Sequence, residues 1–271
     1  MPRVDAIDHP QPRPGGDPAP PSPDDRPDGV LAATGPARRI ERGSIWCGVA
    51  FTALFAVGFA IAGFIPPPAP TTPAQELARD VAAHADRMRA GVQVSWAAGV
   101  LFLPWIAVVS QVLRRIEGPG SIMARVQLGA GIGSTMLFVI PMLQLQAALL
   151  RPERSPEVTQ AMQDLVWMPF VGSWAVPAAQ CVAIAVAVLA DPRPVPLLPR
   201  WVAYFNAWVA LAYVPAIAMP FFHEGPLSWR GLLPWWLGAI AFFAWIVVMS
   251  AVLLRAPAAR PATVAPAGRA S

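Results

Sequence analysis

Carboxylate and imidazole side chains recur at four-residue intervals in one polar segment of this chain. Glu76, Asp80 and His84 would share one face of a helix, since residues four apart lie one above the other. His223 and Glu224 occur in a second polar segment. Such groups ligate zinc or iron when they converge. One hypothesis is therefore a metal site containing Asp80, His84 and His223. The alternative is a solvated helix face and a lone loop histidine.

The stretch QLGAGIGS begins like a glycine-rich phosphate-binding turn, with glycines at 129, 131 and 133. Such a turn follows a strand and borders a water-filled crevice, whereas these glycines lie in an uncharged apolar run. Gly129 and Gly133 have the small-xxx-small spacing that lets two membrane helices approach closely. We therefore predict helix packing through this face, within the chain, with a second copy or with another membrane protein. No pattern indicates a cofactor.

Uncharged polar side chains are also placed inside the apolar runs. One interpretation is that they form hydrogen bonds between helices, and the other is that they line a small-ligand cavity. The candidates are Ser134, Thr135, Gln144, Gln180 and Asn206.

Prolines interrupt the same runs. Each proline removes a backbone donor and crowds the carbonyl four residues earlier, so it kinks a helix and opens space beside it. The kinks are either structural or pocket-forming. The carbonyls freed by Pro141, Pro177 and Pro215 would be those of Leu137, Ser173 and Leu211.

The elements that must position these residues follow from the composition, which is 55% hydrophobic and only 13% charged. Six runs without Asp, Glu, Arg or His each reach the roughly 20 residues that a helix needs to cross a bilayer. Backbone groups in lipid must be satisfied within their own segment, so the runs are helices. The runs are Ser44–Ile65, Gly91–Leu113, Val126–Leu150, Leu165–Ala190, Trp201–Phe222 and Gly231–Leu254.

The predicted fold class is all-α: a polytopic membrane protein with a six-helix transmembrane bundle over residues 43–255. Residues 1–42 and 256–271 are polar and rich in proline or alanine, and we expect disordered tails there. A short outer amphipathic helix should run into the second span. The residues that predict it are Thr72 as N-cap, Pro73, Gln75 and the apolar face of Leu77, Val81 and Met88. Ser155 and Pro156 form a similar helix start before the fourth span.

All twenty basic residues are arginine, and their distribution predicts orientation. From Arg38 onward, eleven arginines belong to the tails and connections of one side and six to the connections of the other. Because the arginine-rich side faces the cytoplasm, we expect both termini inside. Abundant alanine and proline suggest a bacterial genome, hence a multi-pass protein of the bacterial plasma membrane in contact with membrane lipids.

Several features that the sequence lacks restrict the classes of function it can have. The predicted spans contain no ionisable residue of the kind that ion-coupled transporters and pumps place in the membrane. No G-x-S-x-G motif is present. The arginines are scattered at the ends of apolar runs, which argues against nucleic-acid binding. The two cysteines lie in apolar runs and give no disulfide framework.

Two segments are similar to each other: LFLPWIAVVSQVLRR at 101–115 and AFFAWIVVMSAVLLR at 241–255. They share Phe, Trp, Ile, Val, Ser, Leu and Arg at equivalent positions. An internal duplication, as in some transporters, and a shared compositional bias both explain the match.

RMRAG at 87–91, RPERSPE at 151–157 and LLPRWVAYFNAWVAL at 197–211 together resemble uncharacterised actinobacterial six-span membrane proteins, a family of unknown function. The similarity covers Arg42 to Arg255. It implies six spans, and it implies no activity, substrate or site residue.

The leading functional hypothesis is a non-catalytic membrane protein, either an accessory component or one that binds a small apolar ligand. The alternative is a facilitative transporter of an uncharged or lipid-like solute, with a continuous cavity lined by Gln144, Gln180 and Asn206. A membrane-embedded enzyme is the third hypothesis, and it requires the acidic and histidine side chains of the polar segments to converge.

Overall fold

The computed structural model describes residues 35–256 and shows an all-helical bundle with six segments long and apolar enough to cross a membrane. The predicted fold class is confirmed, and the chain is a multi-pass membrane protein. The spans are Gly35–Ala62, Ala74–Glu117, Ile122–Leu149, Pro156–Leu189, Trp201–Phe221 and Leu232–Arg255.

Two of the six spans, the first and third, are single unbroken helices, and the others are divided into two elements. The elements are α1 (Gly35–Ala62), α2 (Ala74–Gly99), α3 (Phe102–Glu117), α4 (Ile122–Leu149), α5 (Pro156–Gly172), α6 (Ala175–Leu189), α7 (Trp201–Ala212), the 3-10 helix η2 (Val214–Phe221), the π-helical segment η3 (Leu232–Leu237) and α8 (Gly238–Arg255).

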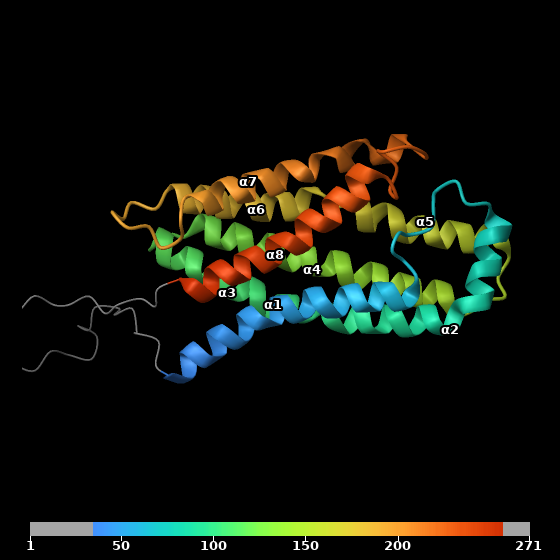
Figure 1. Cartoon of the computed structure of the whole chain (residues 1–271), viewed down its shortest axis with the longest axis horizontal. Coiled ribbons are helices and arrows are strands. Elements are labelled where there is room, and N and C mark those ends of the chain that lie inside the picture. The colour runs from blue at the N-terminus through green and yellow to red at the C-terminus, as the bar shows by residue number, and fades with distance from the viewer. Residues whose placement is uncertain (1–34, 257–271) are drawn as a thin grey trace, which may run out of the picture.

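The helices run along one common axis, and both ends of the described chain lie at the same end of the bundle (Figure 1). We call this the termini end and the opposite one the distal end. The first part of α2 lies across the distal end before the helix turns along the bundle (Figure 1).

Helix α1 begins earlier than the sequence analysis placed it. Residues 35–42 are helical, so the predicted disordered tail was wrong for these positions, and its remainder, 1–34, lies outside the described residues, as does 257–271. Proline is tolerated in a first helical turn, which accommodates Pro36. Glu41 then accepts two hydrogen bonds from Arg115 of α3, at 3.0 and 3.2 Å, which ties this extra length to the bundle.

The predicted amphipathic helix is confirmed as the first part of α2, where Leu77, Val81 and Met88 are all buried. The helix begins at Ala74 with Pro73 as its N-cap, one residue later than predicted. Helix α5 begins at Pro156 after Ser155, as expected. In both helices the N-cap residue makes no side-chain capping hydrogen bond.

Prolines explain where the spans break. Pro104 frees the carbonyl of Val100, which instead accepts a tighter bond from the Leu103 amide at 3.2 Å, and α2 gives way to α3 there. Pro177 likewise has no N–H to donate to the Ser173 carbonyl, and the span breaks between α5 and α6 there. By contrast, α4 continues through Pro141.

Helices α1 and α2 approach most closely where two glycines face each other. A Cβ atom at Gly58 would lie 2.6 Å from the Gly91 carbonyl oxygen. Ser95 donates a hydrogen bond to the Gly91 carbonyl at 3.1 Å. Gly58 with Ala62 and Gly91 with Ser95 are two small-xxx-small pairs.

A layer of aromatic side chains fills the bundle toward the termini end. Trp105 and Trp245 pack edge to face with ring centroids 5.0 Å apart, and Phe102 and Phe242 lie 5.9 Å apart. These are equivalent positions of the two similar segments, which therefore meet across the bundle. Trp105 also donates to Ser250 at 2.8 Å. Whether the segments arose by duplication stays a prediction.

Candidate functional site

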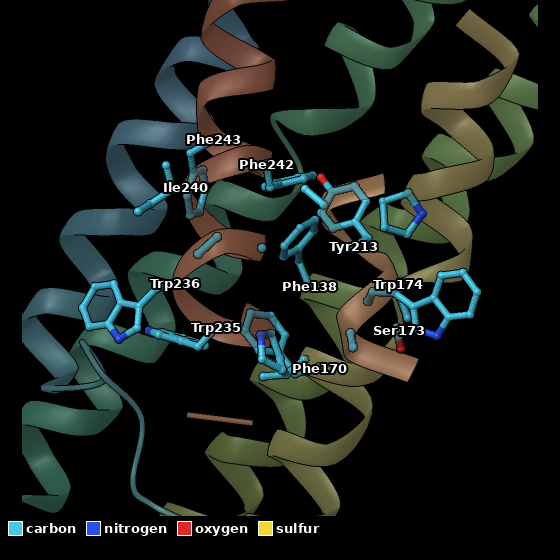
Figure 2. Close-up of a pocket in the computed structure, with 18 of the residues that line it drawn as sticks. Phe138, Phe170, Ser173, Trp174, Tyr213, Trp235, Trp236, Ile240, Phe242 and Phe243 are labelled. Carbon is cyan, nitrogen blue, oxygen red and sulfur yellow. The ribbon is translucent and has the colours of Figure 1, made fainter. Parts of the chain in front are cut away.

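An internal cavity of about 490 Å³ lies between the distal halves of the spans. Its walls come from α1, α4, α5, α6, α7, η2, η3 and α8, and Figure 2 shows side chains that surround it. The lining residues are Phe55, Ala56, Phe59, Ile65, Ser134, Leu137, Phe138, Phe170, Val171, Ser173, Trp174, Pro177, Ala212, Tyr213, Ala216, Pro234, Trp235, Trp236, Gly238, Ala239, Ile240, Phe242, Phe243 and Ala244.

The cavity lies where three spans change their helical geometry. Ser173 and Trp174 form the junction of α5 and α6, and Tyr213 joins α7 to the 3-10 helix η2. Pro234 lies in the π-helical segment that precedes α8. Helix breaks of this kind separate neighbouring backbones, and three of them around one space leave room that the side chains do not fill.

The walls are aromatic and uncharged. Among the described residues, those that line the cavity include no Asp, Glu, Lys, Arg or His. Phe138 and Phe242 pack with ring centroids 5.1 Å apart, and Phe59 stacks on Trp235 at 6.2 Å. Such a lining favours an apolar ligand, since burying an unpaired charge in apolar surroundings is costly.

Three hydroxyl groups are present in the lining. Ser134 donates to the side-chain oxygen of Gln180 at 3.5 Å, and Ser173 donates to the Pro169 carbonyl one turn earlier. The Tyr213 hydroxyl is buried and has no hydrogen-bond partner among residues 35–256. Because the hydroxyl oxygen of Tyr213 is buried against protein, the polar groups that the lining presents to the cavity are few and uncharged.

The cavity has a mouth on the flank of the bundle. Ile65, Trp236 and Ile240 line it and remain 48%, 37% and 63% exposed. They belong to the end of the first span and the beginning of the last one. Because these residues are in or beside membrane-spanning segments, a ligand would enter sideways from lipid.

The cavity is closed toward the termini end. Phe51, Phe102, Trp105 and Trp245 are each fully buried there, and Phe51 packs on Phe102 with ring centroids 5.2 Å apart. No cavity liner comes from α2 or α3. The site is a pocket and not a path through the described bundle.

The structure separates the polar residues that the sequence singled out. Ser134 lines the cavity, and Gln180 lies behind it as its hydrogen-bond partner. Thr135 is buried and donates to the Gly131 carbonyl at 3.0 Å. Asn206 accepts from Trp245 at 2.8 Å, in the layer beneath the cavity. Gln144 is outside the lining, with its side-chain oxygen buried and unpartnered in the described chain.

The polar residues proposed from the sequence as a cavity lining leave out Phe138, Trp235 and Trp236, which make much of the walls. The signal was present, because Trp174, Trp235 and Trp236 each lie within three residues of a span proline. An aromatic residue beside a helix break has room to turn into the space that the break creates. The pairing of proline with tryptophan in the sequence therefore indicates cavity-lining residues that polarity alone does not.

The candidate metal ligands do not gather in one place. His84 bonds Asp80 at 2.9 Å on the exposed face of α2, while His223 lies in the connection between η2 and η3. Within residues 35–256, no three His, Cys, Asp or Glu side chains are close enough to hold a metal ion. This arrangement corresponds to the solvated-face alternative.

The glycine face of α4 makes only part of the predicted contact. Gly131 packs against Ile106 of α3, where an added Cβ would come within 2.9 Å of the side chain. A Cβ at Gly133 would lie 3.0 Å from Val176, and one at Gly129 would meet nothing within 4 Å. The expectation of close intrachain packing was wrong for Gly129, because α3 meets the intervening glycine. An intermolecular role for this face stays a prediction.

Comparison of the chain with protein-family models, curated proteins and solved structures gives no match. The resemblance to the actinobacterial six-span family therefore stays a prediction.

Proposed function

We propose that this protein binds an uncharged, lipid-like molecule in the aromatic cavity, as a non-catalytic membrane component. The observation that carries the proposal is the lining itself: a pocket of about 490 Å³, open on one flank, whose walls are aromatic and uncharged. This volume lies within the range of roughly 300–1,000 Å³ typical of small-molecule sites. A helical bundle in lipid gains nothing from leaving such a space empty, since each wall atom forgoes packing contacts.

Binding is favoured over catalysis because the described lining supplies no carboxylate, imidazole, amine or thiol, and the hydroxyl of its one phenol, Tyr213, is buried. General acid–base chemistry needs a titratable group within hydrogen-bond reach of the reacting atom. The described lining residues include three hydroxyl groups and no His, Cys, Asp, Glu or Lys. The same lack disfavours a charged ligand, which would have no counter-ion in the cavity.

Binding is also favoured over facilitated transport. Transport through the bundle predicts a path lined by Gln144, Gln180 and Asn206, and none of these residues lines the cavity. Trp105 and Trp245 occupy the interior on the termini side, both fully buried. A lateral mouth at Ile65 and Ile240 supports exchange with the lipid phase.

The orientation and location are part of the same proposal. Arg114, Arg115, Arg193 and Arg255 belong to helix ends or connections of the termini end, and arginine-rich connections face the cytoplasm. We infer a bacterial plasma membrane location with both termini cytoplasmic. The cavity then opens into the lipid of the outer leaflet. An accessory role would be exerted through a membrane partner, for which the Gly129 face is a candidate.

Tryptophan fluorescence provides the test, because Trp174, Trp235 and Trp236 line the cavity. A terminally brominated alkane should quench the purified protein in lipid nanodiscs in a saturable manner. Ala216 is buried and lines the cavity, so Ala216→Phe fills part of it. We expect this variant to lose at least about tenfold in apparent affinity, as a partly blocked pocket admits the chain poorly.

The matched control is Ala53→Phe, which adds the same ring at an exposed position of α1 that is outside the lining. This variant should quench like the unmodified protein. Equal quenching by all three proteins, or quenching that never saturates, would show that the probe reaches tryptophans from bulk lipid and would overturn the proposal.

A further inference from the structure

A second pocket, of about 150 Å³, lies at the distal end of the bundle. It is formed by the loop after the first span, the first part of α2, α5 and the segment before η3, and Figure 1 shows α2 lying across this end. The pocket shares no lining residue with the aromatic cavity. Unlike the cavity, it contains charged side chains, which are those of Arg87, Arg230 and Asp80.

The two arginines of this pocket are not neutralised by a carboxylate. Within residues 35–256, neither Arg87 nor Arg230 makes an ion pair. The acidic liner Asp80 instead bonds His84 at 2.9 Å. The Nη2 atom of Arg87 lies against Gly63, where an added Cβ would be 3.0 Å away. The lining therefore has two positive charges and one negative charge, which favours an anion.

A buried amide adds a directed donor. Gln163 of α5 is 2% exposed and lines the pocket. Its side-chain oxygen accepts from the Trp167 indole at 2.7 Å. Because an indole N–H only donates, this bond fixes the oxygen on the Trp167 side and turns the amide nitrogen away. That nitrogen has no partner in the described chain and, unlike the Tyr213 hydroxyl, is not fully occluded by protein, so it is available to a molecule in the pocket.

The donor groups come from three chain segments that are held together without a ligand. Trp229, which precedes Arg230, is 7% exposed and donates to the Pro68 carbonyl at 2.9 Å. This bond fastens the Arg230 segment to the loop that lines the pocket. Met88, next to Arg87, is buried and also lines the pocket. Donors that are positioned in advance lose less conformational freedom on binding.

We propose that this pocket binds a phosphate group through the guanidinium groups of Arg87 and Arg230 and the side-chain nitrogen of Gln163. The planar fork of arginine matches two phosphate oxygens at once. A phosphate has enough oxygens for three donor groups that approach from different directions, whereas a carboxylate has two. The inference does not rest on the proposed function, because no residue of the aromatic cavity takes part.

The pocket lies beside the lipid phase. Ile65 lines the mouth of the cavity and is 48% exposed, whereas its neighbours Phe64 and Pro66 line the second pocket. Phe64 also packs on Phe59 of the cavity wall, with ring centroids 6.0 Å apart. A phosphate here is at the boundary between the spans and their distal connections, the level of lipid headgroups. A phospholipid headgroup and dissolved inorganic phosphate are therefore the two sources to distinguish.

Native mass spectrometry of the full chain in neutral detergent can measure its affinity for phosphatidylglycerol. We expect Arg87→Gln and Arg230→Gln each to weaken binding about tenfold, because each removes charge-assisted hydrogen bonds. Arg87→Lys and Arg230→Lys keep the charge and lose the fork, so their loss should be smaller. A diacylglycerol with the same acyl chains has no phosphate, and its binding should be the same in every variant.

Arg151→Gln is the matched control, because Arg151 is an exposed arginine at the same end of the bundle and lies outside the pocket. It removes the same charge and should leave the affinity for phosphatidylglycerol unchanged. Inorganic phosphate is then added as a competitor. Displacement of the lipid from the unmodified protein at millimolar phosphate would identify dissolved phosphate as a ligand, and no displacement would identify the lipid headgroup.

Two results would overturn the proposal. An equal loss of affinity in Arg151→Gln and in the pocket variants would show a general effect of charge, and no loss in any variant would place the lipid phosphate elsewhere. Arg87 and Arg230 are exposed, so the thermal unfolding temperature of each variant should match that of the unmodified protein. That match separates lost binding from lost folding.

Discussion

A single buried amide, Asn206, links two helices of the bundle. Its nitrogen donates to the Val202 carbonyl at 2.8 Å within α7, and its oxygen accepts from the Trp245 indole of α8 at 2.8 Å. Trp245 in turn packs on Trp105 of α3. In lipid such interhelical hydrogen bonds contribute about 0.6–2 kcal/mol, and here the bond also orients a ring beneath the cavity.

We expect Asn206→Leu to lower the free energy of unfolding by about 1–3 kcal/mol, because the Trp245 indole N–H loses its acceptor in a buried site. The measurement is unfolding of the purified protein in mixed detergent. In a Trp245→Phe background the same substitution should cost about 0.6–2 kcal/mol less.

Gln144→Leu is the matched comparison, since the Gln144 oxygen already lacks a partner in the described chain. Replacing it with an apolar group should be nearly neutral or stabilising. Equal destabilisation by Asn206→Leu and Gln144→Leu would show that the hydrogen bond from Trp245 to Asn206 does not stabilise the fold.

At the scale of elements, helix packing is decided by which glycine meets a neighbour and not by the motif alone. The G-x-G-x-G run of α4 contacts α3 through Gly131, while α1 and α2 meet at Gly58 and Gly91. The spacing of Gly58 with Ala62 was readable in the sequence. What the sequence lacks is the identity of the facing helix, which depends on how all six spans assemble.

We predict that Gly58→Leu strongly destabilises the protein, by about 3 kcal/mol or more, because the new side chain would collide with the α2 backbone and a backbone cannot yield as a flexible side chain does. Gly129→Leu should leave the thermal unfolding temperature in detergent unchanged, because the space beside Gly129 is open.

The variants Gly58→Leu and Gly129→Leu also test whether the Gly129 face binds another molecule. If that face contacts a second copy or another membrane protein, Gly129→Leu alters the association state measured by light scattering while thermal stability is kept. A marked loss of thermal stability in Gly129→Leu would contradict the open environment that the structure gives this position.

The whole molecule shows which features a sequence can determine. Six spans follow from apolar length, and the helix breaks at Ser173 and near Leu211 follow from Pro177 and Pro215, since the missing donor and the ring clash are local effects. That the breaks of three spans surround one cavity is a property of the assembled bundle. Ser134 could be placed among the site candidates because it is a polar residue in an apolar run, whereas the choice of aromatic residues that face the cavity depends on how the spans assemble.

The membrane orientation follows from charge, and the structure supplies the places to test it. Ala83 is exposed on the distal part of α2, and Pro119 is exposed in the turn between α3 and α4 at the termini end. Single-cysteine variants Ala83→Cys and Pro119→Cys, with Cys47 and Cys181 replaced by alanine, keep every arginine. The charge distribution that sets the topology is therefore unaltered.

In intact cells a membrane-impermeant maleimide should label Ala83→Cys and spare Pro119→Cys, and after lysis both should react. This pattern requires the arginine-rich termini end to be cytoplasmic, because the reagent reaches only the outer face before lysis. The reverse pattern would put the termini outside and move the mouth at Ile65 and Ile240 to the inner leaflet. The cavity would then draw on cytoplasmic-side lipids, and the proposed ligand would have to be sought there, although the chemistry of the aromatic walls would be the same.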